Sequence, residues 1–250
     1  MKIAITGKGG AGKTTIVAHL GKILSEMNDV GKILLIDADA TKNLSALLGY
    51  ENITPVNKIK DVIEGRARLE NGLVNLKPSV SDLIDKFSVK ISEKLYLLAI
   101  GGVEKAGMGC LCPENSILRA MLMEIVLKRN EISVIDMEAG LEIMSRGTVK
   151  GVDKILVICE PGYGSVSVTK DIIKFSNELN IKAEVVGNKI RNEEEKEYLS
   201  KNLNLKLFHT IPAREDVRDA TIKGTLVSGG KFYDGVRELA EKIVYLNSRP

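Results

Sequence analysis

Short aliphatic runs alternate along the chain with segments whose apolar residues recur at helical spacing. The runs typical of buried strands are residues 1–6, 32–36, 95–100, 132–136, 154–159 and 183–187, with a last one that ends at 211–212. Helical spacing is clearest over residues 16–24, 117–127, 166–179 and 232–246. Strands that alternate with helices predict an α/β fold, with a doubly wound, mostly parallel sheet of about seven strands flanked by helices.

Residues 50–93 fit this alternation least well. Short helical patterns, such as residues 59–64, are separated there by polar turns that contain glycine. The segment is longer than a simple crossover between parallel strands requires. We therefore predict a single domain over residues 1–250, with residues 50–93 as an elaboration at one edge of the sheet and a candidate partner surface.

The composition agrees with this fold class and narrows the functional classes. Of 250 residues, 44% are hydrophobic and only 4% aromatic, so the predicted core consists mainly of Ile, Val and Leu. A net charge of +3 is too small to indicate nucleic acid or an anionic membrane as a partner. No apolar stretch is long enough to span a bilayer, and the first residues lack a signal-peptide pattern. Because the three cysteines are not a disulfide framework either, we predict a cytoplasmic protein.

A glycine-rich stretch, residues 7–15, lies between the first predicted strand and the first predicted helix. Its spacing matches the phosphate-binding loop G-x-x-x-x-G-K-[ST] at every fixed position, in the strand–loop–helix context that this loop requires. Such glycines let backbone N–H groups surround a polyphosphate, and the helix start adds its positive dipole end. We predict that Lys13 contacts the β- and γ-phosphates and that the Thr14 hydroxyl ligates Mg²⁺. The predicted nucleotide-binding residues of the loop are Gly9, Gly10, Ala11, Gly12, Lys13, Thr14 and Thr15.

Carboxylates end two of the predicted strands. Asp37 and Asp39 follow residues 32–36, and Asp136 ends the strand at 132–136. The carboxyl ends of parallel strands face the crevice in which α/β proteins bind their ligands, so these acids are predicted to lie near the nucleotide. Solvated loop acids are the alternative interpretation.

The run Asn188-Lys189-Ile190-Arg191 bears on the choice of nucleobase. An N-K-x-D run would indicate guanine, because the aspartate accepts hydrogen bonds from that base. Here Arg191 stands in the place of the aspartate. We therefore predict adenine, with Asn188 bonded to its edge and Lys189 in the same site, and so ATP as the nucleotide.

Two of the three cysteines form the pair Cys110-Leu111-Cys112, directly before Pro113. Proline suits the first position of a helix, which places Cys112 near the helix cap, where the positive helix end favours a thiolate. Both thiols can ligate one ion, but two ligands are too few for a stable structural site. A second copy of the chain, face to face with the first, would supply the other two. The alternative is a pair of small apolar residues in a turn.

A second lysine in the glycine-rich stretch, Lys8, lies five positions before Lys13. A solvated surface lysine is one interpretation. The form K-G-G-x-G-K-T-T, however, resembles the deviant Walker A motif of the MinD/ParA/NifH group of dimeric ATPases. That resemblance implies that Lys8 reaches across a dimer interface to the partner's phosphates, and that both lysines are catalytic.

The same resemblance implies roles for residues outside the loop. Asp39 matches the residue of the first switch that orients the attacking water, and Asp37 lies nearer Mg²⁺. Asp136 matches the acid that contacts Mg²⁺ through water in these ATPases. Pro212 and Arg214 resemble the group's second base-contacting loop.

Over essentially the whole chain, the motifs together resemble the CooC family, ATPases that mature the nickel–iron–sulfur centre of carbon monoxide dehydrogenase. The deviant Walker A motif, the Cys-x-Cys pair and the runs 136–148 and 188–192 carry this resemblance. It implies a homodimer that closes over ATP, gathers four cysteine thiolates around one Zn²⁺ or Ni²⁺, and assists nickel insertion into carbon monoxide dehydrogenase. Ligand identity does not choose between zinc and nickel. Glu138 departs from the broader group, which usually has a smaller residue there.

Three other functions remain open at this point. A MinD- or ParA-like positioning ATPase should carry a basic amphipathic C-terminal helix or a basic patch, whereas residues 239–246 are mixed in charge. A NifH-like iron–sulfur carrier would use the cysteines for a coloured cluster. A nucleotide-sensing adaptor would bind ATP without turning it over.

Overall fold

The computed structural model describes residues 1–39, 43–56, 81–100, 120–124, 127–137 and 148–248. Its strands follow the aliphatic runs of the sequence. They are β1 (Lys2–Gly7), β2 (Ile33–Ala38), β3 (Val89–Lys90), β4 (Leu95–Ala99), β5 (Ile132–Met137), β6 (Lys154–Cys159), β7 (Lys182–Ile190) and β8 (His209–Pro212).

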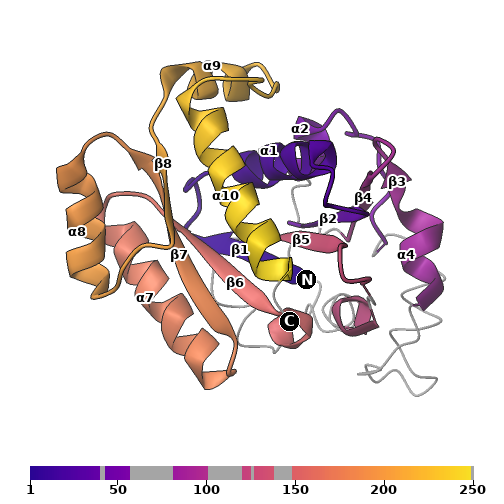
Figure 1. The fold of residues 1–250 in the computed structure, drawn as a ribbon, viewed down its shortest axis with the longest axis horizontal. Coiled ribbons are helices and arrows are strands. Elements are labelled where there is room, and N and C mark those ends of the chain that lie inside the picture. The colour runs from indigo at the N-terminus through magenta and orange to yellow at the C-terminus, as the bar shows by residue number, and fades with distance from the viewer. Residues whose placement is uncertain (40–42, 57–80, 101–119, 125–126, 138–147, 249–250) are drawn as a thin grey trace, which may run out of the picture.

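These strands form one eight-stranded sheet in the order β3-β4-β2-β5-β1-β6-β7-β8 (Figure 1). Neighbouring strands are parallel except β3 and β4, which are antiparallel. The predicted fold class is therefore confirmed. The sheet has one strand more than the seven predicted. The additional strand is β3, an edge strand of two residues that is too short to leave a pattern in the sequence. Strand β7 continues three residues beyond the predicted end at Gly187, because Ile190 pairs again with Pro212 of β8 after an irregularity.

The predicted helices at 16–24, 166–179 and 232–246 are present, with somewhat different bounds. The described helices are α1 (Lys13–Glu26), α2 (Asn43–Leu47), α4 (Ser81–Phe87), α7 (Tyr163–Glu178), α8 (Glu193–Leu203), α9 (Glu215–Ile222) and α10 (Lys231–Ser248), with a 3-10 turn at Thr148–Gly151. Residues 59–64, 117–119 and 125–126 lie outside the described residues, and 120–124 are helical. Within the predicted elaboration, α4 and β3 lie at the β4 edge of the sheet. Among the described helices, none combines the length and apolarity needed to cross a membrane.

The sheet separates two apolar cores. Successive strand residues point to opposite faces, so Ile3 and Ile5 join one core and Ala4 joins the other. The first core lies under α1 and α10, and the second lies under α7 and α8, as Figure 1 shows. Because both faces are covered, the central strands are mostly aliphatic and do not alternate with polar residues.

Helix α1 is packed on two sides, between the sheet and α10 (Figure 1). His19 faces α10: its ring meets the Phe232 ring edge-on at 5.1 Å, and its Nε2 accepts from the Val227 N–H at 3.1 Å. Gly21 faces the sheet, where a Cβ atom would lie only 2.6 Å from Cδ1 of the buried Leu35. These contacts fix the direction of α1, and with it the place where the helix begins.

We expect Gly21→Ala to destabilise the protein. Alanine is the better helix former by about 1 kcal/mol, but its methyl group must displace a buried leucine, and such overpacking costs about 1–3 kcal/mol. Chemical denaturation should therefore give a lower free energy of unfolding for the variant. Lys22→Ala, at the next and exposed position of α1, is the matched control. Adding Leu35→Ala should make the double variant more stable than the sum of the single effects predicts, whereas a Gly21→Ala protein of unchanged stability would contradict this packing.

Candidate nucleotide-binding site

The glycine-rich stretch is a tight loop between β1 and α1. Its backbone turns back where the Ala11 N–H donates to the Lys8 carbonyl at 3.2 Å, and α1 begins at Lys13. Gly12, directly before the helix, has φ of 92°, a left-handed conformation that a residue with a side chain rarely adopts. A Cβ atom at Gly12 would also lie 2.5 Å from Nδ2 of Asn188. The loop therefore has the strand–loop–helix form that a phosphate-binding loop requires.

Two residues at the end of β7 hold this loop from the side. The Asn188 side-chain amide is buried and donates to the Ala11 carbonyl at 2.8 Å. The Lys189 ammonium donates to the Gly10 carbonyl at 2.6 Å. Both had been predicted as nucleotide contacts, and the structure places both directly against the loop. The Asn188 Oδ1 atom is buried and makes no hydrogen bond within the described part of the chain, so it is available to a donor on a ligand.

Two buried carboxylates end the neighbouring strands β2 and β5. Asp37 and Asp136 are paired in register, and neither side chain is exposed. The backbone N–H and the hydroxyl of Ser45 both donate to Asp37, at 2.8 Å and 2.7 Å, and so fix its orientation. Burial raises the pKa of Asp37, and the bonds from Ser45 oppose that rise. Ser45 is a supporting residue that sequence reasoning did not identify.

Asp136 carries the more strongly perturbed carboxyl. Burial raises its pKa to about 7, with the Asp37 carboxylate adding to the rise and the Thr14 hydroxyl and Lys13 ammonium opposing it. Neither oxygen makes a hydrogen bond of ordinary geometry to the described residues. A hard cation would satisfy these oxygens, and carboxylate and hydroxyl oxygens are the donors that Mg²⁺ prefers. The residues predicted for Mg²⁺, Thr14, Asp37 and Asp136, therefore fit that ion.

The remaining predicted catalytic residues lie around this pair. Lys13 is only 7% exposed, and its charge acts on Asp136. Asp39 is half-buried, and its backbone N–H donates to Oδ1 of Asp37 at 3.4 Å. Both residues therefore lie beside the buried carboxylates, and their catalytic roles stay predictions.

Lys8 points away from these acids, toward the start of α7. Its ammonium is 3.9 Å from a carboxylate oxygen of Glu160, the residue that follows β6. The other oxygen of Glu160 accepts from Lys189 at 2.7 Å. Sequence reasoning missed Glu160, although the signal was present: like Asp37 and Asp136, it is an acid at the carboxyl end of an aliphatic strand.

Other predicted residues are placed elsewhere or not described. Arg191 is exposed and pairs with Glu195 of α8 at 3.4 Å, and Arg214 pairs with Asp216 at 3.4 Å. Pro212 ends β8. Cys110 and Cys112 lie outside the described residues. Among the residues that are described, no three His, Cys, Asp or Glu side chains gather as a preformed metal site.

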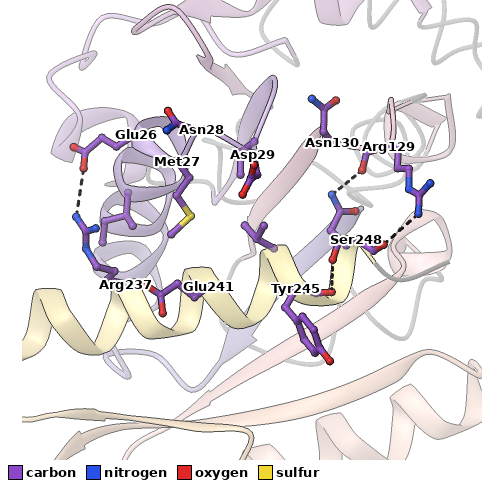
Figure 2. Close-up of a pocket in the computed structure, with 14 residues that line it drawn as sticks. Glu26, Met27, Asn28, Asp29, Arg129, Asn130, Arg237, Glu241, Tyr245 and Ser248 are labelled. Atoms are coloured by element: carbon purple, nitrogen blue, oxygen red, sulfur yellow. Dashed lines mark hydrogen bonds and ion pairs between the residues drawn. The ribbon is translucent and has the colours of Figure 1, made fainter.

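A groove of about 770 Å³ lies on the side of the sheet where β2 and β5 begin, opposite the side on which the loop lies. Figure 2 shows its lining: the end of α1, the last turns of α10 and the segments that precede β2 and β5. Helix α1 begins at the loop and ends at the groove, whereas β2 and β5 begin beside the groove and carry Asp37 and Asp136 near their other ends, so the groove is separate from the predicted nucleotide site.

A braced glycine loop at the start of a buried helix, opposite two buried carboxylates, defines a P-loop nucleotide-binding protein. The family model described as the CobQ/CobB/MinD/ParA nucleotide binding domain matches residues 2–227. The chain belongs to this family.

Individual relatives are similar over most of their length. An uncharacterised ATP-binding protein of Methanocaldococcus jannaschii is 39% identical over 226 residues, which is 87% of each chain. The carbon monoxide dehydrogenase accessory protein CooC of Rhodospirillum rubrum is 38% identical over 194 residues, covering 73% of this chain and 71% of that protein. Among solved structures, the MinD cell division protein of Aquifex aeolicus matches with a TM-score of 0.69 at 26% identity, covering 98% of this chain and 96% of that one.

The raised pKa of Asp136 predicts a pH-dependent effect of Asp136→Asn on the free protein. The folded pKa of about 7 exceeds the unfolded value of 3.8, so protonated Asp136 stabilises the fold at low pH, and this contribution is lost as pH rises through 7. Asparagine stays neutral throughout. The stability of the variant relative to the parent should therefore grow by on the order of 2 kcal/mol between pH 5 and pH 8.

Urea denaturation at both pH values, with a chelator and without nucleotide, measures this difference. Asp171→Asn, which removes an exposed carboxylate on α7, is the matched control and should show no such trend. A constant difference between the Asp136 variant and the parent would contradict the buried, high-pKa carboxyl.

Proposed function

We propose that this protein is an ATPase that dimerises with ATP and assists nickel insertion into carbon monoxide dehydrogenase. One observation carries the specific role: the chain is 38% identical to a CooC protein over 194 residues, and it contains the Cys110-x-Cys112 pair that could hold the metal. The family match supports nucleotide binding independently of that role.

The arrangement around the loop suits hydrolysis of ATP. Backbone N–H groups of the loop and the start of α1 favour the phosphates, and Lys13 supplies the nearest buried cation to the γ-phosphoryl group. Asp39, beside Asp37, is the candidate to orient the attacking water. Thr14, Asp37 and Asp136 would hold Mg²⁺, which when bound neutralises charge on the phosphate oxygens.

Dimerisation gives the second lysine its role. Lys8 is nearly half exposed and does not point at its own buried carboxylates, so it is free to serve a second copy of the chain. In the closed dimer each Lys8 contacts the phosphates of the partner. ATP hydrolysis then removes the γ-phosphate, weakens the attraction between Lys8 and the partner's nucleotide, and reopens the dimer. Loss of a γ-phosphate releases segments held by it in other nucleotide switches.

The metal is the cargo of this cycle. Each copy contributes the two thiolates of Cys110 and Cys112, and closure of the dimer brings four together, as a closed tetrahedral site requires. Zn²⁺ and Ni²⁺ both accept thiolate ligands.

A MinD-like positioning ATPase is the second candidate, because the solved MinD structure matches nearly the whole fold at 26% identity. A membrane-binding helix is the feature that this function would need. The apolar face of α10, which includes Phe232, Leu239 and Ile243, is buried against α1 and β8, so α10 itself does not offer it. A NifH-like carrier would instead give a brown protein with visible absorbance, which inspection of the purified protein decides.

Lys13→Ala should reduce ATP hydrolysis by at least about 100-fold, because charge that develops on the γ-phosphoryl group loses its closest cation. Steady-state phosphate release measures this effect. Lys22→Ala removes an exposed lysine from the same helix and should leave turnover unchanged. Normal turnover in the Lys13 variant would mean that the loop is not the active site.

Cys110→Ser or Cys112→Ser should abolish metal binding rather than halve it, because each leaves only two sulfur ligands per dimer. Metal analysis and light scattering, with and without ATP, measure metal content and dimerisation together. Cys159→Ser is the matched control, since Cys159 is a buried core thiol and the variant keeps the predicted pair. A full metal complement in either pair variant, or one ion held per monomer, would refute a site shared between two copies.

A further inference from the structure

The strand order places Glu160 between the two lysines of the nucleotide site. Strand β6 pairs with β1 on one side, where Gly7 is opposite Ile158, and with β7 on the other, where Gly187 is opposite Cys159. The residues that follow these three strands therefore meet at one edge of the sheet. Glu160 is thus flanked by Lys8 after β1 and by Lys189 near the end of β7.

Its carboxylate contacts the two lysines unequally. Oε2 accepts from Lys189 at 2.7 Å, and Lys189 also donates to the Gly10 carbonyl at 2.6 Å. Lys189 has φ of 60°, a left-handed conformation that is uncommon outside glycine and is kept where the surroundings impose it. Oε1, by contrast, is 3.9 Å from the Lys8 ammonium, at the outer limit of an ion pair. Lys189 is therefore fixed by two partners, and Lys8 is held loosely.

The rest of the Lys8 side chain follows the same direction. A Cβ atom at Gly164, in the first turn of α7, would lie 3.4 Å from Cε of Lys8, so the aliphatic stem runs along the start of that helix. The ammonium and the stem together keep Lys8 beside its own Glu160. In this position the lysine is 44% exposed and is accessible to another anion.

We propose that Glu160 is a positioning residue that holds Lys8 within its own chain and competes with the partner's phosphates for it. This inference rests on the proposed function, in which ATP joins two copies. An exposed ion pair is weak, and a triphosphate carries more negative charge than one carboxylate, so the loosely held Lys8 is the lysine that transfers. Glu160 then keeps Lys189, and the loop stays braced while Lys8 moves. The carboxylate thereby sets the threshold for dimerisation.

Glu160→Gln tests this competition. Glutamine keeps an oxygen that accepts from Lys189 but removes the charge that attracts Lys8. Sedimentation velocity at a saturating concentration of a non-hydrolysable ATP analogue gives the protein concentration at which half of the chains are dimeric. We expect this midpoint to fall by about two- to fivefold, because each dimer that forms breaks two of these weak, partly exposed ion pairs.

Glu26→Gln is the matched control. Glu26 also forms a weak ion pair, with its carboxylate oxygen 3.8 Å from the Arg237 guanidinium, but it lies in the groove on the side of the sheet opposite the loop (Figure 2). The Glu26→Gln substitution removes one negative charge, as Glu160→Gln does, and should leave the dimerisation midpoint unchanged. An equal fall in both variants would mean that overall charge sets dimerisation, and would overturn the inference.

The Lys8→Ala variant shows whether Glu160 acts through Lys8. The double variant Lys8→Ala/Glu160→Gln should have the same midpoint as Lys8→Ala alone. A midpoint that is unchanged or raised in Glu160→Gln, or one that still falls without Lys8, overturns the role of Glu160 and leaves the dimerising ATPase intact. A parent protein that stays monomeric with the analogue at every concentration refutes the proposed dimer itself, and this inference with it.

Discussion

Two carboxylates, Asp37 and Asp136, are buried side by side at the ends of β2 and β5, and the nucleotide site depends on this arrangement. Like charges that are withdrawn from water destabilise the ionised state, which is why burial and Asp37 together raise the pKa of Asp136 to about 7. The Lys13 ammonium offsets part of this cost. The other residues of these strands are buried and mostly aliphatic, so the stability of the two cores is what allows the acids to remain there. A bound cation would satisfy oxygens that the described chain leaves without hydrogen bonds.

The loop opposite these acids is supported by side chains that come from far along the sequence. Asn188 and Lys189 bond to the carbonyls of Ala11 and Gly10, so the loop's shape depends on the end of β7 as well as on its own glycines. The brace also limits the loop's sequence, because the Asn188 amide occupies the space that a side chain at Gly12 would need. Because these bonds fix the loop in the absence of a ligand, binding of phosphates to it would carry a lower ordering cost.

Local patterns in the sequence predicted the parts of this site that depend on local chemistry. The loop motif and the strand-end acids Asp37 and Asp136 were found because motif spacing and the carboxyl-edge rule need no knowledge of strand order. Glu160 also follows an aliphatic strand and obeys the same rule, but its contacts with Lys8 and Lys189 come from which strands are neighbours. Ser45 was missed because its importance comes only from which side chains meet. Helix α8 was missed for a different reason: its first turn is Glu193–Glu195, and its few buried residues, such as Leu199, leave a weak periodic pattern. Edge strand β3 has only two residues and leaves no pattern at all.

Under the proposed function, one copy of this chain is chemically incomplete in two separate respects. The first is electrostatic: the Lys13 charge acts on the buried acids, while the side chain of Lys8 is 44% exposed and its ammonium forms only a weak ion pair with Glu160. The second comes from coordination chemistry: the Cys110-x-Cys112 pair offers half of the ligands that a tetrahedral site requires. A second copy would supply both missing parts. Its Lys8 would contact the phosphate anion, and its two thiolates would complete the ligands of the metal cation. If closure of the dimer completes the nucleotide site and the metal site together, binding of ATP and binding of metal must each favour the other, because linkage between two sites is reciprocal. Release of the metal would then follow from loss of the γ-phosphate without any direct contact between the two sites.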